Sequence, residues 1–121
     1  MTETRIILPW PPSELSPNKR QHWAQLAKAK KLYRAACATQ ARLQGLDRMA
    51  VNAVHLKLTF TPPTRRRFDL DNLLARMKSG LDGLADVIGV DDSRWTLTIG
   101  KSEDIGGMVR VEISSAGVGS I

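Results

Sequence analysis

Four acidic residues stand in two short groups of this sequence, and their type and spacing suit metal-ion chemistry. Asp69 and Asp71 flank Leu70, and Asp91 and Asp92 are adjacent further along the chain. Carboxylate oxygens are the hard ligands that Mg²⁺ prefers, and this metal usually keeps several waters while it bridges to a substrate phosphate. A metal held in this way activates a water or stabilises the attacking and leaving oxygens in phosphodiester hydrolysis. The two groups therefore predict a Mg²⁺ site that contains Asp69, Asp71, Asp91 and Asp92.

The Asp69-Leu70-Asp71 motif also has a purely structural explanation. An Asp that precedes a helix commonly caps its N-terminus and interacts favourably with the helix dipole, without any further function. From these residues alone, metal binding and helix capping both remain open.

A cluster of arginines directly precedes this motif. Arg65, Arg66 and Arg67 lie just before Asp69, and guanidinium groups are suited to bidentate contact with phosphate. The cluster indicates a contact with a nucleic-acid backbone, and a merely solvated loop is the alternative.

Basic residues also recur along the first predicted helix. Three of them step by three along one side, and others lie nearby, which is the pattern of a surface that tracks a phosphate backbone without reading sequence. A solvated helix face is an equal alternative. The residues of this group are Lys19, Arg20, Lys28, Lys30, Lys31 and Arg34.

Lys78 is the base that is best placed to assist the acidic group. It follows Asp71 by almost two helical turns, so both project from one helix face roughly 10 Å apart. An ammonium group there stabilises charge that develops on a phosphate. The competing role is an ion pair with Asp82, one turn further on, worth only a few tenths of a kcal/mol if exposed.

The charge balance of the chain points to an acidic partner. Its 121 residues include 18 Lys and Arg against 12 Asp and Glu, a net charge of +6, which favours a polyanion such as nucleic acid. The length and the 42% hydrophobic content fit one globular domain over residues 1–121. Without an apolar run long enough to span a membrane, or a signal pattern, we expect a cytoplasmic protein with no membrane partner. The lone Cys37 is expected to be a buried hydrophobic residue.

Apolar periodicity predicts the elements that position these residues. Alternation marks strands, and apolar positions three or four apart mark helices. The segment 51–60 is expected to have one buried face, and Val54, Leu56, Leu58 and Phe60 share one side of it. The apolar stripe of the second helix consists of Leu73, Met77, Leu81, Leu84 and Ile88. Gly45 and Gly89 are the expected C-terminal stops of the two helices, and Asp71 is the expected N-cap of the second. Gly106-Gly107 suggests a terminal hairpin, and residues 115–121 are expected to form a flexible tail. The predicted strands are 4–8, 51–60, 95–101 and 108–113, and the predicted helices are 19–43 and 72–87.

The order strand, helix, strand, helix, strand, strand predicts a small α+β domain in which two helices pack on one mixed β-sheet. This order creates a geometric problem for the acidic groups. A straight helix over 72–87 is about 24 Å long, and five further residues span at most about 18 Å. Either the helix is shorter or bent, or Asp92 completes the site of a second subunit.

Three motifs follow one another along nearly the whole chain. They are Leu8-Pro9-Trp10-Pro11-Pro12-Ser13, then Arg65-Arg66-Arg67-Phe68-Asp69-Leu70-Asp71-Asn72-Leu73, and then Gly89-Val90-Asp91-Asp92. In their order and separations these motifs resemble the RusA family of Holliday-junction resolvases. The combination is far more specific than any one motif.

The resemblance implies a RusA-like fold and a homodimeric, metal-dependent endodeoxyribonuclease that nicks two strands of a four-way junction symmetrically. By this resemblance Asp69, Asp71 and Asp92 fall on the catalytic carboxylates, and Asp91 is the neighbouring acid. Because a two-fold dimer matches the symmetry-related strands of a junction, the two active sites are expected near the dimer interface.

The catalytic lysine of the family is where this sequence departs from the pattern. Ala75 stands at its usual distance after the second Asp, and the following segment is about three residues longer. Lys78 is the best substitute, because an insertion of nearly one turn leaves it on the same face as Asp71. Arg76 ranks second, since it points about 140° away from Asp71.

The leading hypothesis is therefore a Mg²⁺-dependent nuclease that resolves branched DNA in recombination and repair, with Asp69, Asp71, Asp92 and Lys78 as its catalytic residues. A non-catalytic module that binds branched DNA is the alternative. A small transferase is disfavoured, because no Gly-rich phosphate loop accompanies the acids. The predicted DNA contacts are Arg65, Arg66, Arg67, Lys19, Arg20, Lys28, Lys31 and Arg76.

Overall fold

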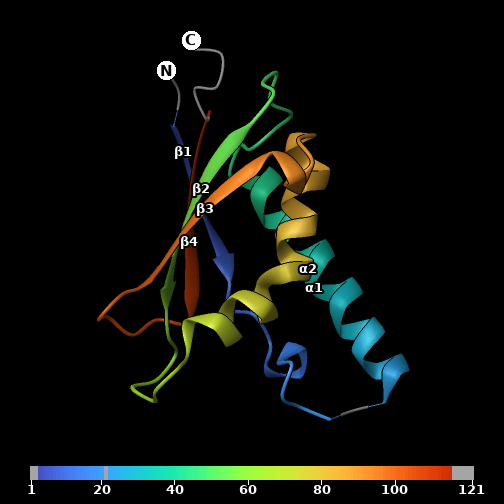
Figure 1. The fold of residues 1–121 in the computed structure, drawn as a ribbon, viewed down its shortest axis with the longest axis vertical. Helices are drawn as coiled ribbons and strands as arrows, with labels where there is room; N and C mark the ends of the chain where they lie inside the picture. The colour runs from blue at the N-terminus through green and yellow to red at the C-terminus, as the bar shows by residue number, and fades with distance from the viewer. Residues whose placement is uncertain (1–2, 21, 116–121) are drawn as a thin grey trace.

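The computed structural model of this chain describes residues 3–20 and 22–115, which form a sheet covered by two helices (Figure 1). The elements follow one another in the predicted order, so the α+β class is confirmed. Their bounds are β1 (Glu3–Pro9), α1 (Trp23–Leu43), β2 (Val54–Thr61), α2 (Leu70–Ile88), β3 (Trp95–Lys101) and β4 (Met108–Ser115), with short 3-10 turns η1 (Ser13–Leu15) and η2 (Asp92–Arg94).

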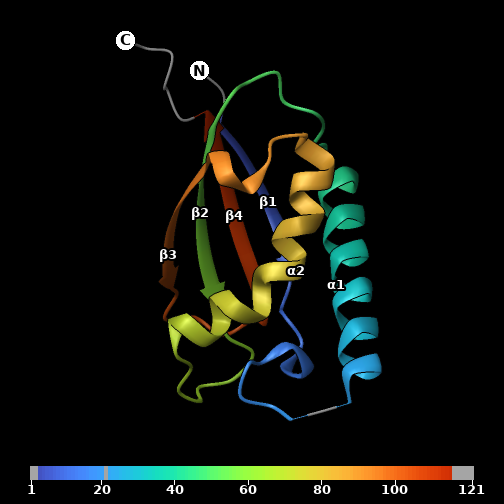
Figure 2. The same cartoon turned by 45° about the vertical axis from the view of Figure 1, so that its right-hand side comes forward.

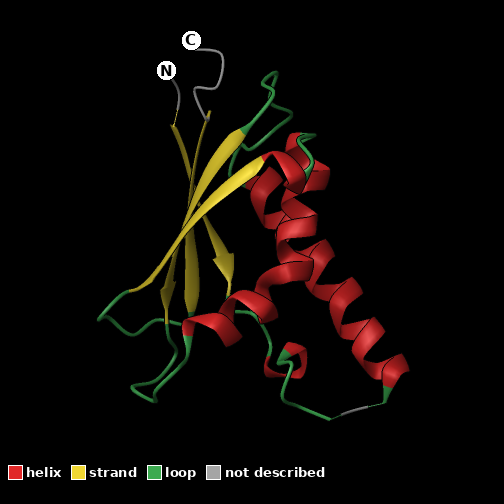
Figure 3. Cartoon of the chain, viewed as in Figure 1, coloured by secondary structure: helices red, strands yellow, loops and turns green. Residues whose placement is uncertain are grey.

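The four strands form one mixed sheet in the order β1-β4-β2-β3. β4 runs antiparallel to both β1 and β2, whereas β3 runs parallel to β2. Parallel neighbours need a crossover connection, and α2 supplies it between β2 and β3. Figure 3 shows the strands as one layer and the two long helices on the same side of it. α2 therefore lies beside β3, so residues from these two elements can meet.

The predicted terminal hairpin is wrong, because β3 and β4 lie on opposite sides of β2. The loop between them passes the end of β2 and binds to it. The amide of Ser102 donates to the carbonyl of Phe60, and the amide of Gly106 donates to that of Pro62, both over 2.8 Å. Gly107 has a φ of 76°, which a glycine adopts without steric cost. The glycine pair thus belongs to a loop that crosses a strand end, not to a tight two-residue turn.

The core lies between the sheet and the helices, as the alternation in β2 predicts. Val54, Leu56, Leu58 and Phe60 are all fully buried, on the face that both helices cover in Figures 1 and 2. The predicted apolar face of this strand is confirmed, although the strand begins at Val54 and ends at Thr61. The neighbouring strands contribute Ile6, Leu8, Val109, Val111 and Ile113 to the same core.

The apolar stripe predicted for α2 is confirmed. Its five members, Leu73, Met77, Leu81, Leu84 and Ile88, are all buried. The helix ends at Gly89, whose left-handed φ of 73° makes it the C-cap, as the sequence predicts. In Figures 1 and 2, α2 changes direction along its length, so that its later turns run beside α1 while its first turns lie under the end of the sheet.

The two helices approach each other closely at two glycines of α2. A Cβ added to Gly80 would lie 2.6 Å from Cε2 of Tyr33, and one added to Gly83 would meet the main-chain oxygen of Arg34. Cys37 of α1 lies at the same contact and is fully buried, as expected for a small hydrophobic residue. Small residues therefore set the distance between α1 and α2, and with it the position of the polar face of α2.

Both helices begin at residues other than those predicted. α1 begins at Trp23 rather than near residue 19, because His22 caps it: the Nδ1 atom accepts a hydrogen bond from the amide of Ala24 over 3.2 Å. α2 begins two residues earlier than expected, at Leu70, with Asp69 as its N-cap. The sequence predicts Asp71 as the cap, but this prediction is wrong, because Asp71 is a residue of the first helical turn.

The C-terminal prediction is only partly within the described residues. Ser115, which was assigned to a flexible tail, is the last residue of β4 and pairs with Val54. Residues 116–121 lie outside the described part of the chain. Within residues 3–20 and 22–115, no helix has the length and the apolar character needed to cross a membrane.

Candidate functional site

Three of the residues predicted for chemistry, Asp71, Lys78 and Asp92, line a cleft between α2 and β3. The cleft has a volume of about 410 Å³, and four charged residues line it: Asp71, Lys78 and Asp82 from α2, and Asp92 from η2. Its remaining walls are apolar and come from the same helix and from β3. They are Leu74, Ala75, Leu81, Trp95 and Leu97. The arrangement brings carboxylates and an ammonium group together on a largely apolar surface.

The helical repeat of α2 explains why three of these charges share the cleft. Because α2 begins at Leu70, Asp71 lies in its first turn, and Lys78 and Asp82 follow two and three turns later on the same face. The opposite face of the helix packs against the core, where Leu73 and Met77 have no exposed surface. Lys78 therefore occupies the place that the sequence predicts, in the same cleft as Asp71.

The other side of the cleft is built by the segment that leads from α2 into β3. The indole Nε1 of Trp95 donates to the carbonyl of Val90 over 2.9 Å, which fixes the turn between them. Asp91 caps η2 by accepting a hydrogen bond from the amide of Ser93 over 3.1 Å. Asp92 is exposed and lines the cleft. The bend of α2 and this turn bring Asp92 to the same cleft as Asp71 within one chain.

Asp91 and Asp69 occupy different surroundings. Hydrogen bonds from the side chain and the amide of Ser93 hold the pKa of Asp91 below its ordinary value, and Asp91 lines an adjoining hollow with Asp82 and Asp86 rather than the cleft. Asp69 is the N-cap of α2, yet its side chain makes no capping hydrogen bond. Neither residue is among those that line the cleft.

Three carboxylates line the cleft, those of Asp71, Asp82 and Asp92. Among residues 3–20 and 22–115, no three His, Cys, Asp or Glu side chains form a group that could hold a metal ion. The predicted set of Asp69, Asp71, Asp91 and Asp92 is therefore divided between the cleft, which holds Asp71 and Asp92, and its surroundings.

Asp82 is the functional candidate that the sequence analysis treated only as a partner for Lys78. It lines the cleft and both adjoining pockets. In the described part of the chain no ion pair joins it to Lys78, since the salt bridges there involve other residues. Its position eleven residues after Asp71, about three full turns, was the signal that could have placed it on the same face.

Arg76 points away from the cleft, as its angular separation from Asp71 predicts. Its Nη2 atom donates to the carbonyl of Pro11 over 2.6 Å, and its guanidinium carbon lies 5.9 Å from the centre of the Trp10 ring. Burial lowers the pKa of Arg76. Trp10 itself packs edge-on against Phe60 and Phe68. Arg76 is thus tied to the segment that contains the first of the three motifs.

The other predicted DNA contacts lie on two exposed regions. Arg65, Arg66 and Arg67 are exposed in the loop between β2 and α2, and Arg66 lies 5.8 Å from the centre of the Phe68 ring. The other basic residues predicted to contact DNA lie on α1 or just before it, and all of them are exposed. They are Lys19, Arg20, Lys28 and Lys31. Both regions flank α2, whose polar face lines the cleft.

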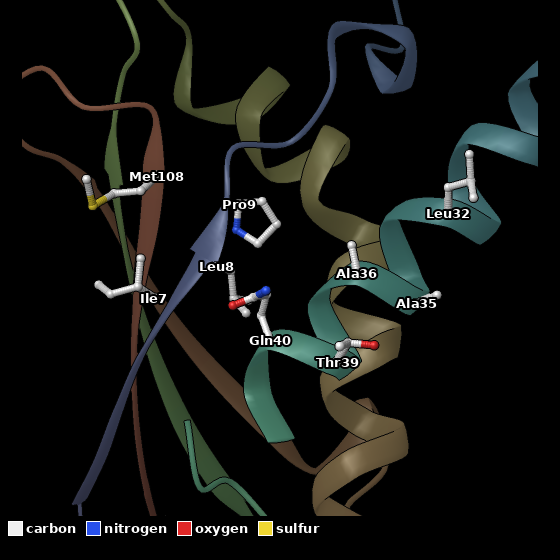
Figure 4. A pocket seen from close by; sticks show the side chains of 9 residues that line it. All are labelled: Ile7, Leu8, Pro9, Leu32, Ala35, Ala36, Thr39, Gln40 and Met108. Atoms are coloured by element: carbon white, nitrogen blue, oxygen red, sulfur yellow. The ribbon is translucent and has the colours of Figure 1, made fainter. Parts of the chain in front are cut away.

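An apolar hollow of about 650 Å³ lies between α1 and β1 (Figure 4). No charged side chain lines it, and its walls include Ile7, Leu32 and Met108. Ala36 of α1 lines this hollow and is exposed. The hollow contains none of the residues predicted for chemistry.

No family model matches this chain. A protein from Xylella fastidiosa (strain Temecula1), described as uncharacterized, is 42% identical to it over 93 residues. The match covers 74% of this chain and 61% of that protein, so the chain spans less than two thirds of the length of the relative.

Proposed function

We propose that this chain is a Mg²⁺-dependent endodeoxyribonuclease of the RusA type, which resolves Holliday junctions by paired symmetric nicks in DNA recombination and repair in the cytoplasm. The observation that carries the proposal is the cleft between α2 and β3. Asp71 and Asp92 come from distant parts of the sequence, and both line it together with Lys78. The order of the three sequence motifs supports the same activity.

The donors in the cleft suit Mg²⁺. Asp71 and Asp92 are exposed, and no ion pair within the described residues occupies either of them. Mg²⁺ is usually bound by one or two carboxylates, with waters and substrate phosphates as the other ligands, so two free carboxylates are a sufficient protein contribution. When bound, the ion supplies activation of a water and stabilisation of charge on the phosphate oxygens.

The chain's own residues bind and orient the substrate in this proposal. The ammonium group of Lys78 neutralises charge that develops on the phosphate. Arg65 and Arg66, in the loop just before α2, hold the adjoining DNA backbone. Lys78 here takes the part of the family's lysine.

We include a homodimer in the proposal, because a four-way junction presents two symmetry-related strands. The two edges of the sheet differ, and the difference favours a dimer that forms at the outer edge of β3. At the β1 edge, the side chain of Gln44 bonds both the amide and the carbonyl of Ile7, each over 2.7 Å. β3 pairs only with β2 among the described strands, so its other edge offers main-chain donors and acceptors to a second copy.

Incubation of the purified chain with a labelled four-way junction and a matched linear duplex tests the activity. We expect paired nicks confined to the junction in Mg²⁺ and none in EDTA. Junction binding without cleavage in Mg²⁺ would favour the alternative, a non-catalytic module for branched DNA. The absence of both junction binding and cleavage would refute both the nuclease and the binding module.

A further inference from the structure

A second pocket, lined by both charged and apolar residues, adjoins the cleft across α2. It has a volume of about 310 Å³ and lies between the loop after η1, α1 and α2. Four cationic side chains from these three segments line it: Lys19, Lys30, Arg76 and Lys78. Asp82 is the carboxylate among its lining residues, so the balance of charge is four positive against one negative.

The walls of this pocket are held in place by contacts of their own. The amide of Lys19 donates to the carbonyl of Ser16 over 3.2 Å, which closes the loop after η1, and Leu15 anchors that loop in the core. Arg76 is fixed by its bond to Pro11, and its Nε atom is buried with no hydrogen-bond partner in the described part of the chain. One cation of the pocket is therefore fixed before any ligand arrives.

The cationic character of the pocket is not cancelled by ion pairs. Lys19, Lys30 and Lys78 are exposed, and they are absent from the salt bridges within residues 3–20 and 22–115. Glu14 lies close enough to Arg76 to oppose the lowering of its pKa. With Asp82 and Glu14 both counted, the positive charges still outnumber the negative ones, four to two.

We propose that this pocket binds one phosphate of the DNA backbone other than the phosphate that is cut. The two sites share Ala75, Lys78 and Asp82, so about two turns of α2 form the ridge between them. A strand whose reacting phosphate lies in the cleft crosses this ridge and brings a neighbouring phosphate among Lys19, Lys30 and Arg76. This inference rests on the proposed function, because it takes the cleft as the place of cleavage.

The pocket positions the strand rather than reacting with it. A second phosphate held on the other side of this ridge fixes the direction in which the strand enters the cleft, and such contacts set register without reading base sequence. Lys30 is the residue that separates the two sites experimentally, since it lines the pocket and not the cleft. Lys57 is a matched control, because it is an exposed lysine of β2 whose neighbours Leu56 and Leu58 point to the helices.

The first experiment follows the isotope-labelled full chain by NMR in EDTA while inorganic phosphate is added. We expect saturable shifts at the amides around the pocket, those of Ser16, Lys19 and Ser79 among them. Lys30→Gln should weaken this binding about tenfold, as expected for loss of a charge-assisted hydrogen bond, and Lys57→Gln should leave it unchanged. Equal weakening in both variants would overturn the pocket, since only general surface charge would then be involved.

The second experiment distinguishes a backbone phosphate from free phosphate. Four-way junctions that carry a single neutral methylphosphonate at successive positions are bound in EDTA. We expect about a tenfold loss at one or two positions near the branch point in the wild-type chain, and no further loss at those positions in Lys30→Gln. The same position dependence in Lys30→Gln as in the wild type would overturn the proposal.

The two proposals fail in different ways. If the wild-type chain shows the Lys30-dependent pattern but no cleavage in Mg²⁺, the phosphate pocket stands and the nuclease activity is refuted. If it cleaves junctions and Lys30→Gln changes neither binding pattern, the activity stands and the pocket is refuted.

Discussion

Asp91 and Asp92 are neighbours in the chain with different surroundings. The carboxylate of Asp91 is engaged by Ser93 as the cap of η2, whereas that of Asp92 lines the cleft. Only the second is available to a ligand between α2 and β3. The sequence alone could not separate these roles, because adjacent residues of the same type differ here only in the direction that a short turn gives them.

The contrast between these neighbours yields a prediction. Asp92→Asn should lower junction cleavage at least about a hundredfold, because it removes a carboxylate worth several kcal/mol to the reaction, and it should leave the melting temperature unchanged. Asp91→Asn should retain most cleavage and a melting temperature close to that of the wild type, because Asn caps a helical turn about as well as Asp. Single-turnover rates and thermal unfolding of both variants check this, and the reverse order of rates would contradict it.

At the scale of elements, the distance between α1 and α2 fixes where the polar face of α2 lies. Gly83 permits this distance, since any Cβ there would meet the main-chain oxygen of Arg34, and a backbone atom cannot swing aside as a side chain can. Lys30 of α1 and Lys78 of α2 line one pocket only because the helices approach so closely.

Gly83→Ala should therefore destabilise the fold. The helix gains roughly 1 kcal/mol when Gly becomes Ala, but overpacking typically costs about 1–3 kcal/mol, and a clash with backbone belongs at the upper end. We expect a net loss of at least about 1 kcal/mol in urea unfolding. Gly100→Ala is the control, because an added Cβ there meets nothing within 4 Å. A Gly83→Ala variant as stable as Gly100→Ala would contradict the close packing.

A salt bridge also joins the two helices. Asp86 of α2 accepts two hydrogen bonds from Arg34 of α1, both 2.8 Å long, and these hold the pKa of Asp86 below its ordinary value of 3.8. Because the folded state favours the charged carboxylate, the stabilisation is present at neutral pH and is lost as the pH falls through the lowered pKa.

Asp86→Asn should accordingly lower the melting temperature at neutral pH by a small amount, since both partners are exposed. The difference from the wild type should shrink as the pH falls below about 4. Thermal unfolding across this range measures it. A difference that stays constant down to the most acidic pH at which the chain folds would show that the ion pair is not the cause.

The elements that could be predicted from sequence are those whose apolar residues face a single layer. The alternation of β2 and the stripe of α2 identified their buried faces, and Gly89 identified the end of α2. The pairing of β3 could not be predicted in this way, because Gly106-Gly107 is compatible with both a hairpin and a crossing loop. The place of Asp92 also depended on the bend of α2, which periodicity does not report.

At the scale of the whole molecule, the proposed reaction requires two sites. The free edge of β3 offers a place for a second copy, whereas Gln44 covers the edge of β1 at Ile7. We expect the purified chain to sediment as a dimer, with twice its mass of 13.4 kDa, and to nick both strands of a junction within one encounter. A chain that sediments as a monomer, alone and on the junction, would contradict this part of the account.

Basic residues surround the cleft on both sides, in the loop before α2 and along α1. Binding that depends on such contacts releases counterions and weakens steeply with salt. The acids of the cleft have the opposite effect, because they repel phosphate until a cation is present. Removal of one cleft carboxylate should therefore separate binding from cleavage.

The most direct measurement is the comparison of the wild-type chain with Asp71→Asn on a labelled four-way junction, for both binding and cleavage in Mg²⁺. We expect Asp71→Asn to bind the junction as tightly as the wild type or more tightly, because a negative charge near phosphate is gone. We also expect that this variant does not cleave the junction. Asp47→Asn, the same change at an exposed residue between α1 and β2, should behave as the wild type. Unchanged cleavage by Asp71→Asn would contradict the assignment of the cleft as the active site.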